Sequence, residues 1–280
     1  MREQGFSSPL KQYELSKDSS SEDSVALKAK HKLTGAKTFL KVIYKDMDLD
    51  DLSILPEVAL HERLQGHQNV AKYIESFEKG NFIYIAFAYI ARGDLQSYMI
   101  NHRVMFLTEH ELKDGARQIG QALSDIHNAG CLHNDVHPRH ILLKRHQIKP
   151  QSASSSTPQH KEESISVKLG GFSHCTPVPE ETDLFSSELI DPENQDAKAL
   201  YKAPEVISRG LLSKESDVWA LGISLFWLTC GRLPFATLRE TAESPVPWHF
   251  YERSHHPVSA NFKNLINTML AKDKNQRPTI

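Results

Sequence analysis

The feature that most constrains the fold is a change in the hydrophobic pattern near residue 90. Before it, short apolar runs rich in β-branched and aromatic residues alternate with turn signals, and only DLSILPEVALHERLQGH has helical spacing. After it the helical period dominates, as in LTEHELKDGARQIGQALSDIHNAG, which opens on a Thr108–Glu111 capping box. The sequence therefore predicts an α+β chain, with a small β-rich part over 13–90 that carries one helix and a larger helical part over 91–280.

Three segments do not fit this alternation. Residues 1–12 are polar and predict a leader. Residues 146–164, HQIKPQSASSSTPQHKEES, are rich in Ser, Gln and Pro, which predicts a disordered insert between two short strands. The most apolar stretch, WALGISLFWLTC at 219–230, is too short to cross a bilayer and predicts a buried helix.

Charge and cysteine content narrow the choice of partner and compartment. Lys and Arg total 33 against 35 Asp and Glu, so no basic excess favours nucleic acid or an anionic membrane as a partner. The cysteines, Cys131, Cys175 and Cys230, show neither metal-ligand spacing nor a disulfide framework, which fits a reducing compartment. The first residues contain no apolar core of signal-peptide length. We expect a protein of the cytoplasm or the nucleus.

The segment CLHNDVHPRHILL, 131–143, places Asp135 among His133, His137 and His140. It suggests a metal site, a catalytic loop, or a catalytic loop that has lost its chemistry. Imidazole nitrogens suit zinc, and a catalytic zinc needs three protein ligands. Spacing within this segment alone does not separate the three alternatives.

The order of motifs along the chain resembles that of the eukaryotic protein kinase domain, from about Tyr13 to the last residue. The motifs that carry the resemblance are TFLKVI, LPEVALHERLQGHQNV, IYIAFAYIARGDL, LHNDVHPRHILL, VKLGGFSHC, YKAPEVI, SDVWALG and KDKNQRPTI. Each motif is weak alone, but their order and gaps together are specific. The resemblance implies a bilobal kinase-like fold with a β-rich N-lobe and hinge over 13–90 and a helical C-lobe over 91–280.

The resemblance also implies roles for individual residues. Asp135 would occupy the position of the catalytic base, and Lys41 would pair with Glu57. The positions that would line the adenine cleft are Lys41, Phe39, Ala26, Phe87, Ala88, Ile90 and Leu142. Phe39 replaces the small residue that lies over adenine, so we expect its ring to fill much of the space that a purine needs.

Several kinase positions are replaced. The two Mg²⁺ ligands, an asparagine and the aspartate of D-F-G, correspond to His140 and Gly171, which offer no hard oxygen ligand. The lysine after the base is His137, and the arginine before it is Asn134. The three positions of the glycine-rich turn correspond to Ser19, Ser21 and Ser24, which resist the positive φ values that glycine accepts.

Positions that support the kinase scaffold are retained. The resemblance implies that His133 and Phe172 join His61 and Tyr73 in an internal stack. It further implies that Asp217 holds the 133–135 backbone and that Glu205 pairs with Arg277. Because His133 then points inward, only two histidines remain beside Asp135, and we expect no metal site in this loop.

These observations predict a pseudokinase that acts in signalling as a scaffold or regulator of other proteins, with little or no phosphotransfer and no cofactor. One alternative is a divergent protein serine/threonine kinase that uses Asp135 and Lys41 with ATP and Mg²⁺. The other is a nucleotide-binding switch without turnover. The chain stops at RPTI, where the family continues with most of another helix, so we expect a shortened C-terminal end.

Overall fold

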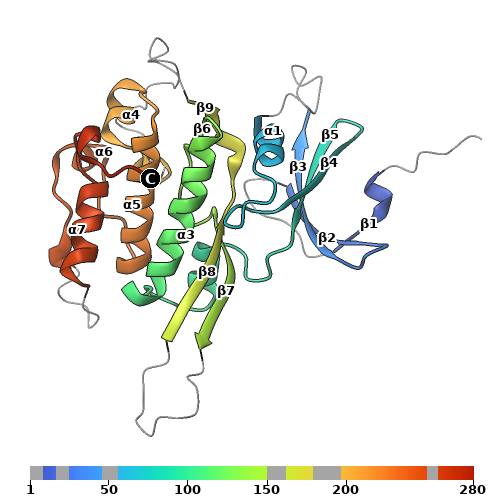
Figure 1. Ribbon diagram of the computed structural model, residues 1–280, viewed down its shortest axis with the longest axis horizontal. Helices are drawn as coiled ribbons and strands as arrows, with labels where there is room; N and C mark the ends of the chain where they lie inside the picture. Colours follow the sequence, from blue (N-terminus) through green and yellow to red (C-terminus); the bar gives the residue numbers. More distant parts are fainter. Residues whose placement is uncertain (1–8, 17–24, 46–55, 150–161, 179–196, 251–257) are drawn as a thin grey trace, which may run out of the picture. The chain divides into compact units, whose positions relative to one another are not determined.

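The structure, a computed structural model, describes residues 9–16, 25–45, 56–149, 162–178, 197–250 and 258–280. These residues form two compact units, and Figure 1 labels their strands and all of their α-helices except α2. The first contains the described residues up to His67 together with Ala71–Ile90, and the second contains Gln68–Val70 and the described residues from Ala91 on. We expected 68–70 in the β-rich part, but the backbone of this segment bonds to the second unit, where the N–H of Leu169 donates to the carbonyl of Asn69.

The first unit is built on a five-stranded sheet with the order β1-β2-β3-β5-β4. Its strands are β1 (Tyr13–Leu15), β2 (Val25–His31), β3 (Lys37–Tyr44), β4 (Tyr73–Lys79) and β5 (Phe82–Ala88). Successive side chains of β3 point to opposite faces of the sheet, and both faces contain apolar residues. Leu40 packs with Tyr13 and Phe77 on one face, whereas Ile43 packs on the other with Ile85 and with Val58 of α1 (Pro56–Arg63). The predicted strands and single helix are therefore present.

Residues 9–12 differ from the leader that we predicted. They form a 3-10 turn, Pro9–Gln12, that leads directly into β1. Leu10 packs against the face of the sheet that contains Leu40. An apolar contact with the sheet thus gives order to part of a segment that looks polar as a whole.

The second unit is mainly helical, with its helices coloured from green to red in Figure 1. They are α2 (Leu95–Asn101), α3 (Glu109–Asn128), α4 (Pro204–Arg209), α5 (Lys214–Cys230), α6 (Leu238–Glu243) and α7 (Ala260–Met269). Most residues of α5 are buried, which confirms the prediction for 219–230. Gly222 allows α7 to approach α5 closely, because a Cβ there would lie 2.9 Å from a methyl group of Leu270. Among the described residues, no helix has the length and apolar content needed to span a membrane.

The second unit also contains a long two-stranded ribbon, β7 (Ile141–Lys149) and β8 (Glu162–Leu169). We assigned 146–164 to an insert, but 146–149 and 162–164 continue the antiparallel ladder. Their polar composition misled the assignment, because main-chain pairing extends a ribbon even where the side chains are polar. The rest of the predicted insert lies outside the described residues.

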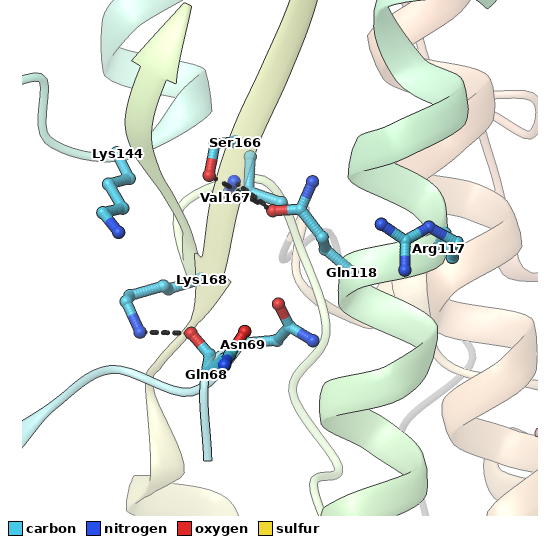
Figure 2. A pocket seen from close by; sticks show the side chains of 8 residues that line it. All are labelled: Gln68, Asn69, Arg117, Gln118, Lys144, Ser166, Val167 and Lys168. Carbon is cyan, nitrogen blue, oxygen red and sulfur yellow. Dashed lines mark hydrogen bonds between the residues drawn. The ribbon is translucent and has the colours of Figure 1, made fainter. Parts of the chain in front are cut away.

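A polar pocket of about 400 Å³ lies where the 68–70 segment meets this ribbon and α3 (Figure 2). Gln118 of α3 accepts the Val167 N–H at 3.0 Å, and the Lys168 ammonium donates to the Val70 carbonyl at 2.9 Å. Both side chains hydrogen-bond to main-chain groups of other segments, which indicates that the pocket is a structural junction. None of its lining residues is a predicted site residue.

The N-terminus of α3 provides a first prediction. Thr108 Oγ1 accepts the Glu111 N–H at 3.2 Å, and the Glu111 carboxylate accepts the Thr108 N–H at 2.6 Å. Thr108→Ala should lower the free energy of unfolding by about 1 kcal/mol, because the first helical turn loses this cap. Urea unfolding measures the change. Thr108→Ser, which keeps the hydroxyl, should remain near the wild type, and equal stability of the alanine variant would contradict the role of the cap.

Candidate functional site

Residues 133–140, which we call the histidine-rich loop, connect β6 (Cys131–Leu132) to β7. One buried carboxylate holds the backbone at the start of this loop. Asp217, in the first turn of α5, accepts the N–H groups of His133 and Asn134, each at 2.8 Å. Its Oδ2 also lies 2.9 Å from Nε2 of His127. Asp217 is 1% exposed. The predicted role of Asp217 is confirmed, and the start of the loop has a fixed conformation.

His133 is a structural residue. Its ring is fully buried, Nε2 donates to the Gly170 carbonyl at 3.0 Å, and Nδ1 accepts the Asp135 N–H at 3.2 Å. Burial lowers the pKa of His133, so the ring is neutral near pH 7. It meets Phe172 edge-to-face at 5.4 Å, as the kinase resemblance implied for this pair.

Asn134 connects the loop to two later segments. Its φ of 61° lies in the left-handed region, which asparagine tolerates better than most residues. Its side-chain amide donates to the His174 carbonyl at 3.0 Å and to Thr176 Oγ1 at 2.9 Å. The Lys202 ammonium donates to the Asn134 carbonyl at 2.6 Å. These bonds attach the segment that contains His174 to the histidine-rich loop.

The Asp135 carboxylate lies among three imidazoles. Its oxygens are 3.4 Å from His137 Nε2, 3.5 Å from His140 Nδ1 and 3.7 Å from His174 Nε2. The Asp135 side chain is 10% exposed. Burial raises the pKa of the carboxyl, but the neighbouring imidazoles more than offset this effect and hold the pKa well below its usual range. Asp135 is therefore ionised at neutral pH.

His140 fills the space beside Gly171. Its Nδ1 donates to the Asp135 carbonyl at 2.9 Å, and burial together with nearby His137 lowers its pKa to about 4. Gly171 has a φ of +80°, and a Cβ built on it would lie 2.2 Å from Cγ of His140. No side chain fits at position 171 while the His140 ring remains in place. The two replacements that we noted separately are thus one coupled feature.

Sequence reasoning missed His174. It lies three residues after Gly171, in the 3-10 turn Phe172–His174, and this turn places its ring near Asp135. The available signal was a histidine shortly after a motif already aligned beside the loop. Tyr201, whose ring centroid lies 5.7 Å from that of His137, was also missed.

In the first unit, the Lys41 ammonium and the Glu57 carboxylate form the predicted ion pair. The register of β3 places Phe39 opposite Phe87 on β5, and it places Lys41 opposite Ala26 on β2. Thus Phe39 and Lys41, two residues apart on β3, share one face of the sheet.

The other predicted adenine positions are distributed over both units. Ala88 ends β5, Ile90 follows it, and Leu142 lies on β7 of the second unit. Occlusion of a purine by Phe39 stays a prediction. The turn positions Ser19, Ser21 and Ser24 lie outside the described residues.

Two further scaffold features are present. The Arg277 guanidinium donates to both carboxylate oxygens of Glu205, at 2.6 and 2.8 Å, as expected. In the first unit, the rings of His61 and Tyr73 stack with centroids 6.0 Å apart. The resemblance therefore predicted contacts correctly within each unit.

Sequence comparison shows which family combines these features. The profile of the protein kinase domain matches residues 21–280. The chain belongs to the protein kinase domain family. The bilobal α+β kinase fold that the motifs implied agrees with this membership.

Named relatives of this kinase domain are serine/threonine kinases. MAP kinase-interacting serine/threonine-protein kinase 2 of Xenopus laevis is 29% identical over 72% of this chain and 41% of its own length. Serine/threonine-protein kinase PKZ1 of Phytophthora infestans is 27% identical over 79% of this chain and 54% of its own. Inactive serine/threonine-protein kinase PLK5 of Mus musculus is 27% identical over 80% of this chain and 33% of its own length. The chain thus spans about half or less of these relatives.

Mg²⁺ does not fit the two kinase metal positions in this domain. The ion requires oxygen ligands in near-octahedral geometry. His140 offers nitrogen, and Gly171 offers no side chain and leaves no room for one. Asp135, Lys41 and Glu57 thus remain in a kinase domain that lacks the metal ligands of the reaction.

Proposed function

We propose that this kinase domain is a pseudokinase, which acts by binding other proteins and transfers little or no phosphate. The observation that carries the proposal is the His140 ring in the space beside Gly171. An aspartate at 171 cannot coexist with this ring. Both metal ligands are therefore lost together, in a way that a small side-chain movement does not repair.

The loss has a large energetic consequence. Catalysis in kinases depends mainly on positioning and on neutralising the charge that develops between the β- and γ-phosphates. Removing the metal takes away several kcal/mol of transition-state stabilisation, and each 1.36 kcal/mol is a tenfold change in rate. Retention of the Lys41–Glu57 pair and of Asp135 does not replace this contribution.

The retained residues support a second candidate, a divergent protein serine/threonine kinase. The Lys41–Glu57 ion pair is formed, and Asp135 is ionised, as a general base must be. A nucleotide-binding switch without turnover is a third candidate. We further propose that the partners are proteins. We also propose a reducing compartment, the cytoplasm or the nucleus, because the spacing of the three cysteines suggests no disulfide framework.

Thermal unfolding with ATP separates the candidates. We expect no change in Tm at millimolar ATP, with Mg²⁺, with Mn²⁺ or without metal, because a ligand that does not bind the native state cannot stabilise it. Binding at 100 times its Kd would contribute about 2.7 kcal/mol and would be readily seen. An increase in Tm without metal would favour the switch.

The decisive comparison uses Asp135→Asn. A metal-dependent increase in Tm, together with phosphate incorporation that this variant abolishes, would contradict the pseudokinase proposal and support the kinase. A variant with Lys41→Ala provides the matched control for nucleotide binding, since it removes the ion pair with Glu57 in the first unit and changes no residue of the loop that contains Asp135.

A further inference from the structure

Four side chains with metal-binding atoms lie in one region of the second unit, three of them close to one another and the fourth, His174, close to Asp135. Asp135 and His137 come from the histidine-rich loop, His140 ends that loop, and His174 comes from the 3-10 turn after Gly171. One ligand atom from each of Asp135, His137 and His140 lies within 4.8 Å of the other two. Among the described residues, this is the one cluster of three or more such side chains.

The distances between the Asp135 carboxylate oxygens and the three imidazole nitrogens fit a bound ion better than they fit direct hydrogen bonds. The carboxylate oxygens lie 3.4, 3.5 and 3.7 Å from nitrogens of His137, His140 and His174. Hydrogen bonds between nitrogen and oxygen are normally 2.7–3.2 Å long. In tetrahedral zinc sites, with bonds of about 2.0–2.1 Å, neighbouring ligand atoms lie about 3.3 Å apart. The three nitrogen–oxygen separations, one to Oδ1 and two to Oδ2 of Asp135, need only a small contraction to reach this value.

His137 supplies an independent observation. The residue is 5% exposed, and its Nε2 is buried without a hydrogen-bond partner. Buried polar atoms without a partner are rare in folded proteins, and each requires an explanation. This nitrogen lies 3.4 Å from Oδ1 of Asp135, farther than in a normal hydrogen bond, and a bound ion would satisfy it.

We propose that Asp135, His137, His140 and His174 form a binding site for a transition metal ion of the zinc class. Imidazole nitrogens with one carboxylate oxygen form a donor set typical of Zn²⁺ and unlike that of Mg²⁺. In the sequence analysis we rejected zinc because only two histidines remained beside Asp135. His174 supplies a third histidine near Asp135.

Binding requires a change of tautomer at two rings. Nδ1 of His137 accepts the Arg139 N–H at 3.2 Å, so the neutral ring carries its proton on Nε2. In the metal-bound state this proton lies on Nδ1, and the long bond to Arg139 is lost. If His140 binds through Nδ1, it likewise gives up its bond to the Asp135 carbonyl. Both are single hydrogen bonds, so their loss is small beside the gain from metal ligation.

A bound ion changes what Asp135 can do. A carboxylate that ligates a metal no longer has that oxygen available to accept a proton from a substrate hydroxyl. The site would instead cross-link the histidine-rich loop to the segment after Gly171. The inference does not rest on the proposed function, because it concerns these side chains without nucleotide.

The test uses the tag-free full chain, first treated with a chelator and then titrated with Zn²⁺ by calorimetry. We expect one ion per chain. His140→Ala should weaken binding by about 100-fold, and His174→Ala, whose side chain is 63% exposed and replaceable by water, by about 10-fold. Co²⁺ provides a second readout, because four-coordinate Co²⁺ absorbs strongly in the visible range and octahedral Co²⁺ weakly.

His110→Ala is the matched control, since His110 is exposed on α3 of the same unit and absent from the cluster. Its affinity for Zn²⁺ should equal that of the wild type. No binding below millimolar Zn²⁺, equal affinities of the His140, His174 and His110 variants, or a weak octahedral Co²⁺ spectrum would each overturn the proposal. Far-UV circular dichroism in chelator verifies folding, and the exposed His174 keeps the test valid if the His140 variant unfolds.

Discussion

Arg277→Ala is expected to lower the free energy of unfolding by about 3–5 kcal/mol. The Arg277 side chain is fully buried and donates to both oxygens of Glu205 and to the carbonyls of Ala271 and Glu215. Its guanidinium also lies 4.9 Å from the ring centroid of Trp219. Removing it leaves the Glu205 carboxylate largely buried without its partner, which is the costly outcome. Equilibrium unfolding in urea measures the change.

The control for this prediction is Arg239→Ala. Arg239 pairs with Glu243 one helical turn away, but its side chain is 84% exposed. An exposed pair of this kind contributes about 0.3–0.5 kcal/mol, so this variant should be nearly as stable as the wild type. Equal effects of the two substitutions would contradict the structural role of the buried Arg277–Glu205 pair.

Gly171→Asp should be the second strongly destabilising change, with a loss of about 3 kcal/mol or more. The aspartate must adopt a φ of +80°, which strains an L residue, and its Cβ would overlap the His140 ring. Restoring the kinase residue at this position alone should therefore damage the fold. Thermal or urea unfolding measures the loss.

Two comparisons separate the cost of backbone strain at position 171 from the cost of steric overlap with the His140 ring. Gly130→Asp has a similar φ of +74°, but a Cβ at position 130 meets no atom within 4 Å, so this variant should lose only the backbone contribution. Gly171→Asp combined with His140→Asn should recover stability relative to Gly171→Asp, with a coupling energy of about 1 kcal/mol or more. Simple additivity of the two changes would contradict the coupled loss.

The secondary structure was predictable where local signals were strong. The capping residues Thr108 and Glu111 and the apolar period fixed the start of α3, and short apolar runs rich in β-branched and aromatic residues identified β3 and β5. The ends of β7 and β8 were not predictable, because polar residues in a ribbon pair through their backbones. The prediction that 68–70 belong to the β-rich part was wrong, since their place in the second unit depends on main-chain pairing with Leu169, 99 or more residues away.

The site was predictable only in part. The order of motifs identified Asp135 as a retained kinase position and His140 and Gly171 as replaced ones. It gave no sign that the two replacements are coupled. The overlap between His140 and a Cβ at 171 is a tertiary fact, because 31 residues separate the two positions. His174 was missed for the same reason: its proximity to Asp135 depends on the 3-10 turn and on the bonds from Asn134.

The hydrogen bonds of Asp217 bear on how fast this loop can be recognised. Because Asp217 fixes the backbone of His133 and Asn134 from within the second unit, this backbone is ordered without a nucleotide. A partner protein of the kind we propose, docking beside this backbone, would meet a conformation already formed, and no ordering step would precede contact. Association is then set by diffusional encounter and orientation, at about 10⁵–10⁷ M⁻¹ s⁻¹. Differences among the protein partners that we propose should appear mainly in the lifetimes of their complexes.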